Sequence, residues 1–126
     1  MKKIIVSILL MLLILTPRTV NADEIRYVKA TAYCLNKNLT AMETKPRYGV
    51  VAGKREWLGK TCIAWLDDGD GLIKPENYFG TFCFEDLGGS DAIKAGHVID
   101  VWIEGYENAK NFGCKKMIIQ IIDSEG

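Results

Sequence analysis

The stretch F-E-D-L-G-G-S-D-A-I-K-A-G-H-V-I-D-V-W, residues 84–102, joins the end of one predicted strand to a second predicted strand. The first strand covers 78–84 and the second 98–103, and each alternates its side chains between two faces. Between them, Gly88 and Gly89 permit a turn with positive φ. The stretch also carries three aspartates: Asp86, Asp91 and Asp100. Carboxylates at strand ends beside glycines are typical of a groove site, although turn and solvated strand positions explain the same aspartates.

Strands are also predicted on either side of this stretch, at 25–33, 49–52, 61–66 and 117–122. Residues 106–112 predict one short helix, which ends at Gly113. In the strand at 25–33 neither face is purely polar, and this predicts that both faces are covered. Six short strands and one short helix, without any repeat, favour an all-β fold of the small closed-barrel type.

Residues 1–22 have the pattern of a secretory signal peptide. Lys2 and Lys3 precede an apolar run at 4–15, and the small residue Ala22 offers a cleavage point. The run is shorter than the roughly 20 residues that a membrane-spanning helix needs, although an uncleaved anchor is an alternative. We therefore expect a secreted, extracytoplasmic protein with no stable membrane insertion after cleavage.

The remaining residues, 23–126, have the length of a single domain, and we expect it to be a monomer. All 16 acidic residues lie there, whereas three of the 16 basic residues lie in 1–22, so the formal charge of 23–126 is −3. A general nucleic-acid binder carries a basic face, and this charge argues against such a partner. A neutral or sugar-rich ligand is compatible with it.

Four cysteines lie in this domain: Cys34, Cys62, Cys83 and Cys114. An even number in a small exported domain predicts two disulfides, for which three pairings are possible. We favour Cys62–Cys83, because these residues lie in adjacent predicted strands, together with Cys34–Cys114. No C-x-x-C pair occurs, which argues against a zinc site. Four reduced thiols, packed as small apolar side chains, are the alternative.

The loop D-D-G-D-G at 67–71 brings three carboxylates together, as a calcium site requires. The spacing of an EF-hand is absent, because with Asp68 and Asp70 at loop positions 3 and 5, Leu66 falls at position 1 and Asn77 at position 12. We therefore expect a solvated Asp-Gly turn, and neither a metal nor a cofactor.

Two carboxylates in a partly enclosed groove are the minimum needed to cleave a glycosidic bond. Asp100 has apolar neighbours in sequence, and desolvation favours its protonated form, so we assign it as the acid. Asp86 lies beside the glycine pair, where backbone N–H groups can hold it as an anion. Trp102 could stack on a sugar ring, although an aromatic residue of a small barrel is more often part of the core. The one histidine, His97, is interpreted as a surface loop residue.

Several motifs in order extend this hypothesis to a family: A-T-A-Y-C (30–34), L-T-A-M-E-T-K (39–45), G-V-V-A (49–52), L-G-K (58–60), E-D-L-G-G (85–89), I-K-A-G-H-V-I-D-V-W (93–102) and N-F-G-C (111–114). Between Lys29 and Ile122 the chain resembles the bacterial 3D domain, which is named for three aspartates. That family is similar to the catalytic domain of the lytic transglycosylase MltA and to stationary-phase muralytic enzymes. The resemblance implies a six-stranded double-psi β-barrel that acts on peptidoglycan glycan strands.

The implied reaction cuts the bond between N-acetylmuramic acid and N-acetylglucosamine and leaves a 1,6-anhydro sugar. The 6-hydroxyl of the sugar attacks, so one aspartate can serve as acid and then as base. Asp86 matches the aspartate of the family's D-T-G-G, and Asp100 that of its I-D. Further residues are expected to bind substrate: Gly88, Gly89, Thr44, Glu43 and Trp102.

The chain also departs from the family pattern. The third aspartate is replaced by the segment 53–55, G-K-R, and Leu87 stands where a threonine is usual. Met42 and Glu43 stand where a Thr-Gly pair is common, and Glu43 is a candidate for the missing acid. The alternative function is therefore a catalytically impaired barrel that binds glycans or another protein.

Overall fold

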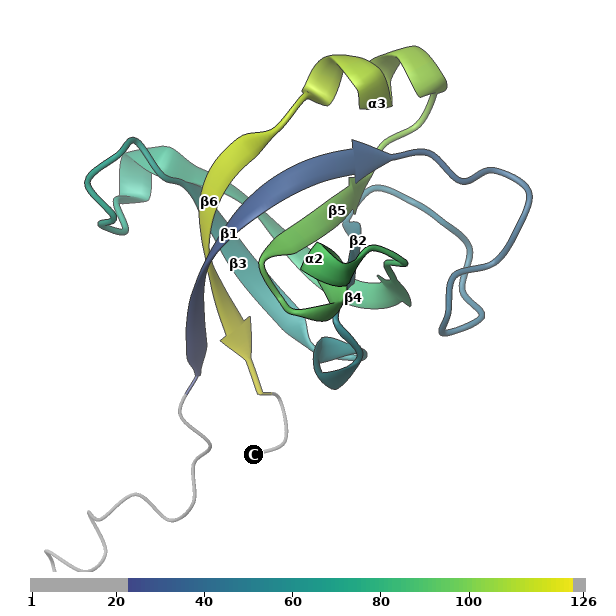
Figure 1. Cartoon of the computed structure of the whole chain (residues 1–126), viewed down its shortest axis with the longest axis horizontal. Coiled ribbons are helices and arrows are strands. Elements are labelled where there is room, and N and C mark those ends of the chain that lie inside the picture. Colours follow the sequence, from purple (N-terminus) through teal and green to yellow (C-terminus); the bar gives the residue numbers. More distant parts are fainter. Residues whose placement is uncertain (1–22, 124–126) are drawn as a thin grey trace, which may run out of the picture.

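The structure is a computed structural model that describes residues 23–123, so the predicted signal peptide lies outside the described residues. Six strands form it: β1 (Glu24–Tyr33), β2 (Val50–Gly53), β3 (Thr61–Leu66), β4 (Tyr78–Leu87), β5 (Val98–Trp102) and β6 (Lys115–Ile122). They close into one barrel in the order β1-β5-β2-β4-β3-β6 (Figure 1). The predicted all-β closed barrel of six strands is thus confirmed.

Two of the neighbouring strand pairs, β1/β5 and β2/β4, are parallel, and the other four are antiparallel. The first and last strands pair with each other, so the barrel has no free edge strand. A long connection, residues 34–49, leaves the end of β1 and returns to β2 (Figure 1). Among the described residues, no helix is long and apolar enough to cross a membrane.

Helix α3 (Tyr106–Phe112) has the predicted bounds, and Gly113 follows it with a φ of 72°. Three short helices were not predicted: η1 (Arg55–Trp57), η2 (Pro75–Asn77) and α2 (Asp91–Lys94). Helix α2 begins where the Ser90 side chain accepts a hydrogen bond from the backbone N–H of Ile93. Asp91, expected in a loop, is therefore the first residue of a helical turn.

The barrel interior is filled by every second residue of the strands, as the alternation of a β-strand requires. The inward-facing residues form one buried cluster: Val28, Ala30, Val51, Cys62, Ala64, Phe82, Phe84, Ile99, Val101, Met117, Ile119 and Ile121. Residues between them face outward. Asp100 lies between the inward-facing Ile99 and Val101, so its side chain is on the outer surface of the barrel.

Two local expectations about packing were wrong. Gly88 and Gly89 do not belong to the glycines with positive φ. A Cβ at Gly88 would lie 2.4 Å from Cδ1 of Ile93, so this glycine is required by the close approach of α2. The outer face of β1 is also not covered at its start, where Ile25 is 50 % and Tyr27 is 62 % exposed.

Candidate functional site

A row of outward-facing residues crosses four adjacent strands. Thr31 on β1 pairs with Asp100 on β5, Asp100 pairs with Ala52 on β2, and Ala52 pairs with Asp86 on β4. Register partners in neighbouring strands point to the same face, so both carboxyl groups lie on one side of the sheet. Two strand spacings separate their Cα atoms by about 10 Å. The buried methyl group of Ala52 lies between them.

A bulge gives Asp86 this position. Val51 pairs with Phe84, but Ala52 pairs with Asp86, so β4 has one extra residue, Glu85, at this point. In a regular ladder the residue that follows Phe84, which is Glu85, would be the partner of Ala52. The strand therefore changes register to place Asp86 in the row. Alternation in the sequence does not reveal such a bulge.

Both carboxylate oxygens of Asp86 accept hydrogen bonds. Its Oδ2 accepts from the Tyr33 hydroxyl at 2.9 Å, and its Oδ1 accepts from the backbone N–H groups of Ala41 and Leu87, both at 3.0 Å. Three donors on one carboxylate suit the ionised form, which only accepts. Burial, and then the hydrogen bond to Asp86, raise the pKa of Tyr33 well above its usual range, so its hydroxyl remains a donor.

Asp100 has a different environment. Its Oδ1 accepts one hydrogen bond, from the Thr31 hydroxyl at 3.1 Å. Burial raises the pKa of Asp100 above its ordinary value, and the negative charge of Asp86 raises it further, whereas the bond from Thr31 lowers it. Desolvation thus acts in the direction expected from the apolar neighbours of this residue. One carboxyl group is held by donors and the other is disposed to keep its proton, as acid catalysis requires.

The loop 34–49 is fixed beside the row by an ion pair that the sequence did not predict. The Arg47 guanidinium donates to both carboxylate oxygens of Glu85, at 2.9 and 2.6 Å, and Glu85 is only 8 % exposed. The Met42 N–H donates to the Glu85 carbonyl at 3.1 Å. The hydrogen bond from Arg47 lowers the pKa of Glu85 below its ordinary value, with a further contribution from Thr44.

Thr44 and Glu43, both predicted to bind substrate, belong to the turn of this loop. The Thr40 and Thr44 hydroxyls lie 2.6 Å apart, and the Thr44 side chain also hydrogen-bonds to Glu85. Thr44 therefore stabilises the conformation of this loop. Glu43 is exposed, with a φ of 62°, and its N–H donates to the Thr40 carbonyl. No side-chain hydrogen bond or ion pair of Glu43 is found within 23–123. The structure does not bring Glu43 together with the two aspartates as a third acid.

Trp102, predicted as a stacking surface for sugar, is only 6 % exposed. Its Nε1–H donates to the Leu35 carbonyl at 3.0 Å, and Tyr48 packs against it edge to face at 5.2 Å. The indole therefore anchors the loop 34–49 and leaves little free ring surface. Gly88 lines a hollow of ≈ 320 Å³ together with Leu87, whereas Gly89 is exposed.

Four hollows of ≈ 320 to ≈ 450 Å³ mark the described surface, and neither Asp86 nor Asp100 lines any of them. Their neighbours do: Leu87 lines one hollow, and Tyr33, which donates to Asp86, lines another of ≈ 370 Å³. The carboxyl groups thus lie outside these four hollows, next to residues that line two of them.

The four cysteines are free thiols, so neither predicted disulfide is present. Cys62 faces the core, whereas Cys83 lies between the inward-facing Phe82 and Phe84 and points outward. The Sγ of Cys83 lies 4.0 Å from the Thr61 hydroxyl on that outer face. Adjacent strands were predicted for this pair correctly, but the register puts the two sulfurs on opposite sides of the sheet.

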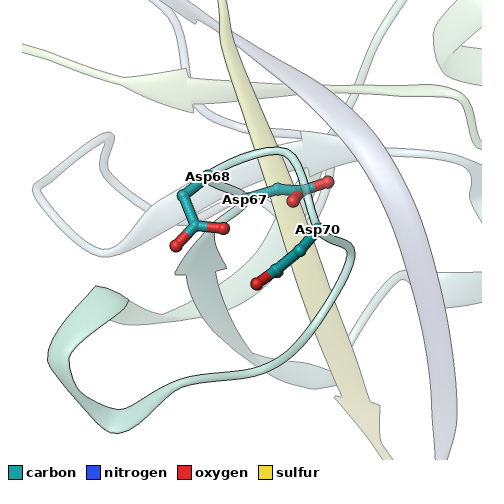
Figure 2. Close-up of side chains that lie close together, drawn as sticks. All are labelled: Asp67, Asp68 and Asp70. Carbon is teal, nitrogen blue, oxygen red and sulfur yellow. The ribbon is translucent and has the colours of Figure 1, made fainter.

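The acidic loop 67–71 brings together carboxylate oxygens of Asp67, Asp68 and Asp70 within 4.8 Å of one another (Figure 2). The Lys74 ammonium lies 2.8 Å from Asp68 and also contacts Asp70. Hydrogen bonding, first from Lys74, lowers the pKa of Asp68 to about 2. Oδ1 of Asp67 accepts from the N–H groups of Gly69 and Gly71. Lys74 thus offsets one of the three negative charges of the loop.

The chain matches no protein-family model, no curated protein and no solved structure in the three comparisons made with it. The functional argument therefore rests on the residues of the row. Its distinctive features are two half-buried carboxyl groups on one face, of which one has three donors and the other a raised pKa.

Proposed function

We propose that this protein cleaves the bond between N-acetylmuramic acid and N-acetylglucosamine in peptidoglycan, as a lytic transglycosylase. One observation carries the proposal: Asp86 and Asp100 are both register partners of Ala52, and Asp86 accepts from three donors whereas Asp100 is half-buried and accepts from one side chain. Paired carboxyl groups of opposite state are the apparatus of glycosidic cleavage. The order of motifs shared with the bacterial 3D domain supports the same substrate.

In the proposed reaction Asp100 donates its proton to the glycosidic oxygen as the bond to the sugar breaks. Asp86, as a carboxylate, stabilises the positive charge that develops on the sugar ring. The Asp100 carboxylate then takes the proton of the 6-hydroxyl as that oxygen closes the anhydro ring. Asp100 ends the cycle protonated, and no water is consumed.

The finer assignment of fold and location belongs to the same proposal. Two parallel pairs within an otherwise antiparallel six-stranded barrel support the double-psi type. The sequence pattern of residues 1–22 supports secretion to the cell wall or periplasm, where peptidoglycan is found. The net charge of −3 for 23–126 supports a ligand other than nucleic acid.

A second candidate is a barrel that binds glycans, or another protein, without cleaving them. It is favoured by the position of Asp86 and Asp100 outside the hollows and by the absence of a third acid from Gly53 to Arg55. Digestion of purified sacculi separates the two candidates. The enzyme releases 1,6-anhydro-muropeptides, which mass spectrometry identifies, whereas the binding module sediments with sacculi and releases none.

The informative variant is Asp100→Asn, with Glu76→Gln as the matched control, because Glu76 is exposed and lies on η2 away from the row. Asp100→Asn should keep the circular dichroism spectrum of the barrel and lose product release, and Glu76→Gln should keep both. Release of product by a folded Asp100→Asn protein would exclude the assigned acid. Absence of both binding and release by the wild-type protein would exclude both candidates.

A further inference from the structure

One feature of the barrel surface that the proposed reaction does not use is a hollow of ≈ 390 Å³ with two lysines in its wall. Lys29 on β1 and Lys116 on β6 are exposed register partners on the outer face. Directly opposite residues of an antiparallel pair have Cβ atoms about 5 Å apart, and like charges there are destabilising. Two ammonium groups in this position therefore lower the stability of the fold unless something anionic lies between them.

No described residue neutralises this pair. Neither Lys29 nor Lys116 forms an ion pair within 23–123. Asp67 is the acidic residue in the wall of the hollow, and its Oδ1 already accepts from two backbone N–H groups of its own loop. His97 is also in the wall, and its carbonyl accepts from the Lys29 N–H at 3.0 Å. The wall of the hollow thus has two lysines that form no ion pair, and one aspartate, on a domain whose formal charge is −3.

The remaining wall is apolar and includes Tyr27, Val98 and Met117. The volume falls in the range of about 300 to 1,000 Å³ that is usual for small-ligand pockets. An apolar wall with two lysines that form no ion pair suits a ligand that has a carboxylate or phosphate on an otherwise weakly polar body. A neutral glycan ring would give the two ammonium groups hydroxyl acceptors but no opposite charge.

The hollow and the aspartate row lie on the same pair of parallel strands, β1 and β5. On the outer face, Lys29 precedes Thr31 on β1, and Val98 precedes Asp100 on β5. Two residues of a strand cover about 7 Å. An anionic group bound between the lysines, and so between β1 and β6, would also be about one and a half strand spacings across the sheet from β5, and thus about 10 Å from Asp100.

We propose that the Lys29–Lys116 hollow binds an anionic group of the cell-wall ligand and so holds that ligand across Asp100. The inference rests on the proposed wall substrate, but it concerns binding and not cleavage. A wall polymer offers two sources of such a group, the carboxylates of the stem peptides and the phosphates of attached polymers. Both have the chemistry that the hollow recognises, and the experiment distinguishes them.

The test is cosedimentation of the protein with purified sacculi in three forms: intact, freed of stem peptides by an amidase, and freed of phosphate polymers by hydrofluoric acid. The double variant Lys29→Ala/Lys116→Ala should bind intact sacculi about tenfold more weakly than the wild type, since two surface charge pairs contribute up to roughly 1 kcal/mol each. Lys110→Ala, which removes an exposed lysine of α3, is the matched control and should bind as the wild type does.

Removal of the true anionic source should lower wild-type binding to the level of the double variant and leave the variant unchanged. Equal binding of wild type and double variant to intact sacculi would overturn the proposal, and so would no binding of either. Product release is measured in the same samples. Binding that depends on the lysines, without product release, would support the binding role of the hollow and contradict the proposed enzyme. Product release that is the same in the wild type and the double variant would support the enzyme and contradict the binding role of the hollow.

Discussion

Asp86 and Asp100 lie on opposite sides of Ala52, and each is its register partner, Asp86 from β4 and Asp100 from β5. The side chain between the two carboxyl groups is a single methyl group, so nothing bulky separates them. The Glu85 bulge is what brings Asp86 into this row, because without it Glu85 would be the partner of Ala52. The predictions that follow depend on this arrangement and on the loop packed beside it.

Replacement of Asp100 should change the pH dependence of stability. Burial and the charge of Asp86 raise the pKa of Asp100 above its ordinary value of 3.8, so the folded state binds this proton more tightly than the unfolded chain. The free energy of unfolding of the wild type therefore falls as pH rises from about 3.8 through the raised pKa, relative to Asp100→Asn, which cannot ionise. Urea denaturation of both proteins at pH 3 and pH 7 measures this difference in the free energy of unfolding.

Asp100→Asn should gain stability relative to the wild type between these two pH values. Asp91→Asn is the control, because Asp91 is exposed at the start of α2. A constant difference between Asp100→Asn and the wild type would contradict the buried position of the Asp100 carboxyl group.

Tyr33→Phe removes one of the three donors to Asp86 and leaves the packing of the ring in place. A hydrogen bond to a charged group contributes about 1.5 to 3 kcal/mol when buried, and the half-buried position suggests the lower end for the loss in unfolding free energy. Product release should fall as well, because Asp86 is then less firmly held. Tyr106→Phe is the control, since Tyr106 is 69 % exposed. Equal losses for both variants would argue against a specific bond at Asp86.

Arg47→Gln should loosen the loop 34–49 in a pH-dependent way. The folded pKa of Glu85 is lowered by Arg47, so the pair stabilises the fold above the ordinary carboxyl value of 4.5 and its effect is lost as pH falls through the lowered pKa. We expect only a small loss of unfolding free energy at pH 7, because Arg47 is exposed to solvent, and little difference from wild type at pH 2. Arg55→Gln, on η1, should show no such trend, and chemical denaturation across pH provides the comparison.

Glu43→Gly should stabilise the protein by about 0.5 to 1 kcal/mol. Glu43 has a φ of 62°, where an L side chain costs roughly 1 to 2 kcal/mol and glycine does not, although glycine adds freedom to the unfolded chain. Glu43→Ala is the sharper control, because alanine keeps the strain and removes only the carboxylate. A gain with alanine as large as with glycine would mean that the Glu43 charge, not its backbone, is unfavourable.

Alkylation should distinguish free thiols from disulfides. Cys62 is completely buried, and burial raises its pKa to about 12, so iodoacetamide should modify it only after unfolding. Cys114 is exposed and should react in the native protein. Mass spectrometry of native and urea-unfolded samples shows which cysteines have been alkylated. Protection of Cys34 and Cys114 until a reductant is added would show that they are bridged, contrary to the structure.

The strands could be predicted because alternating apolar residues record which side of each strand faces the core. The strand at 61–66 and the helix at 106–112 have the predicted bounds. Each of the other strands differs from its predicted bounds by one to three residues, at one end or at both. Alternation is a local signal, and it also placed Asp100 between two core residues correctly.

Contacts between distant segments could not be predicted in the same way. The hydrogen bond from Tyr33 to Asp86 and the ion pair of Arg47 with Glu85 depend on strand order, on the bulge and on how the loop 34–49 packs. The disulfide prediction failed for the same reason, since adjacency of strands does not give their register. Trp102 was assigned to the ligand from its residue type alone, whereas its N–H is used by the Leu35 carbonyl.

The pairing of β6 with both β1 and β3 has a consequence for how the protein is made. The barrel cannot close until the last strand, ending at Ile122, has left the ribosome, so earlier strands must wait with open edges. A chain cut before Lys115 would lack the element that joins the two halves of the cylinder, and it should aggregate rather than fold as a smaller barrel.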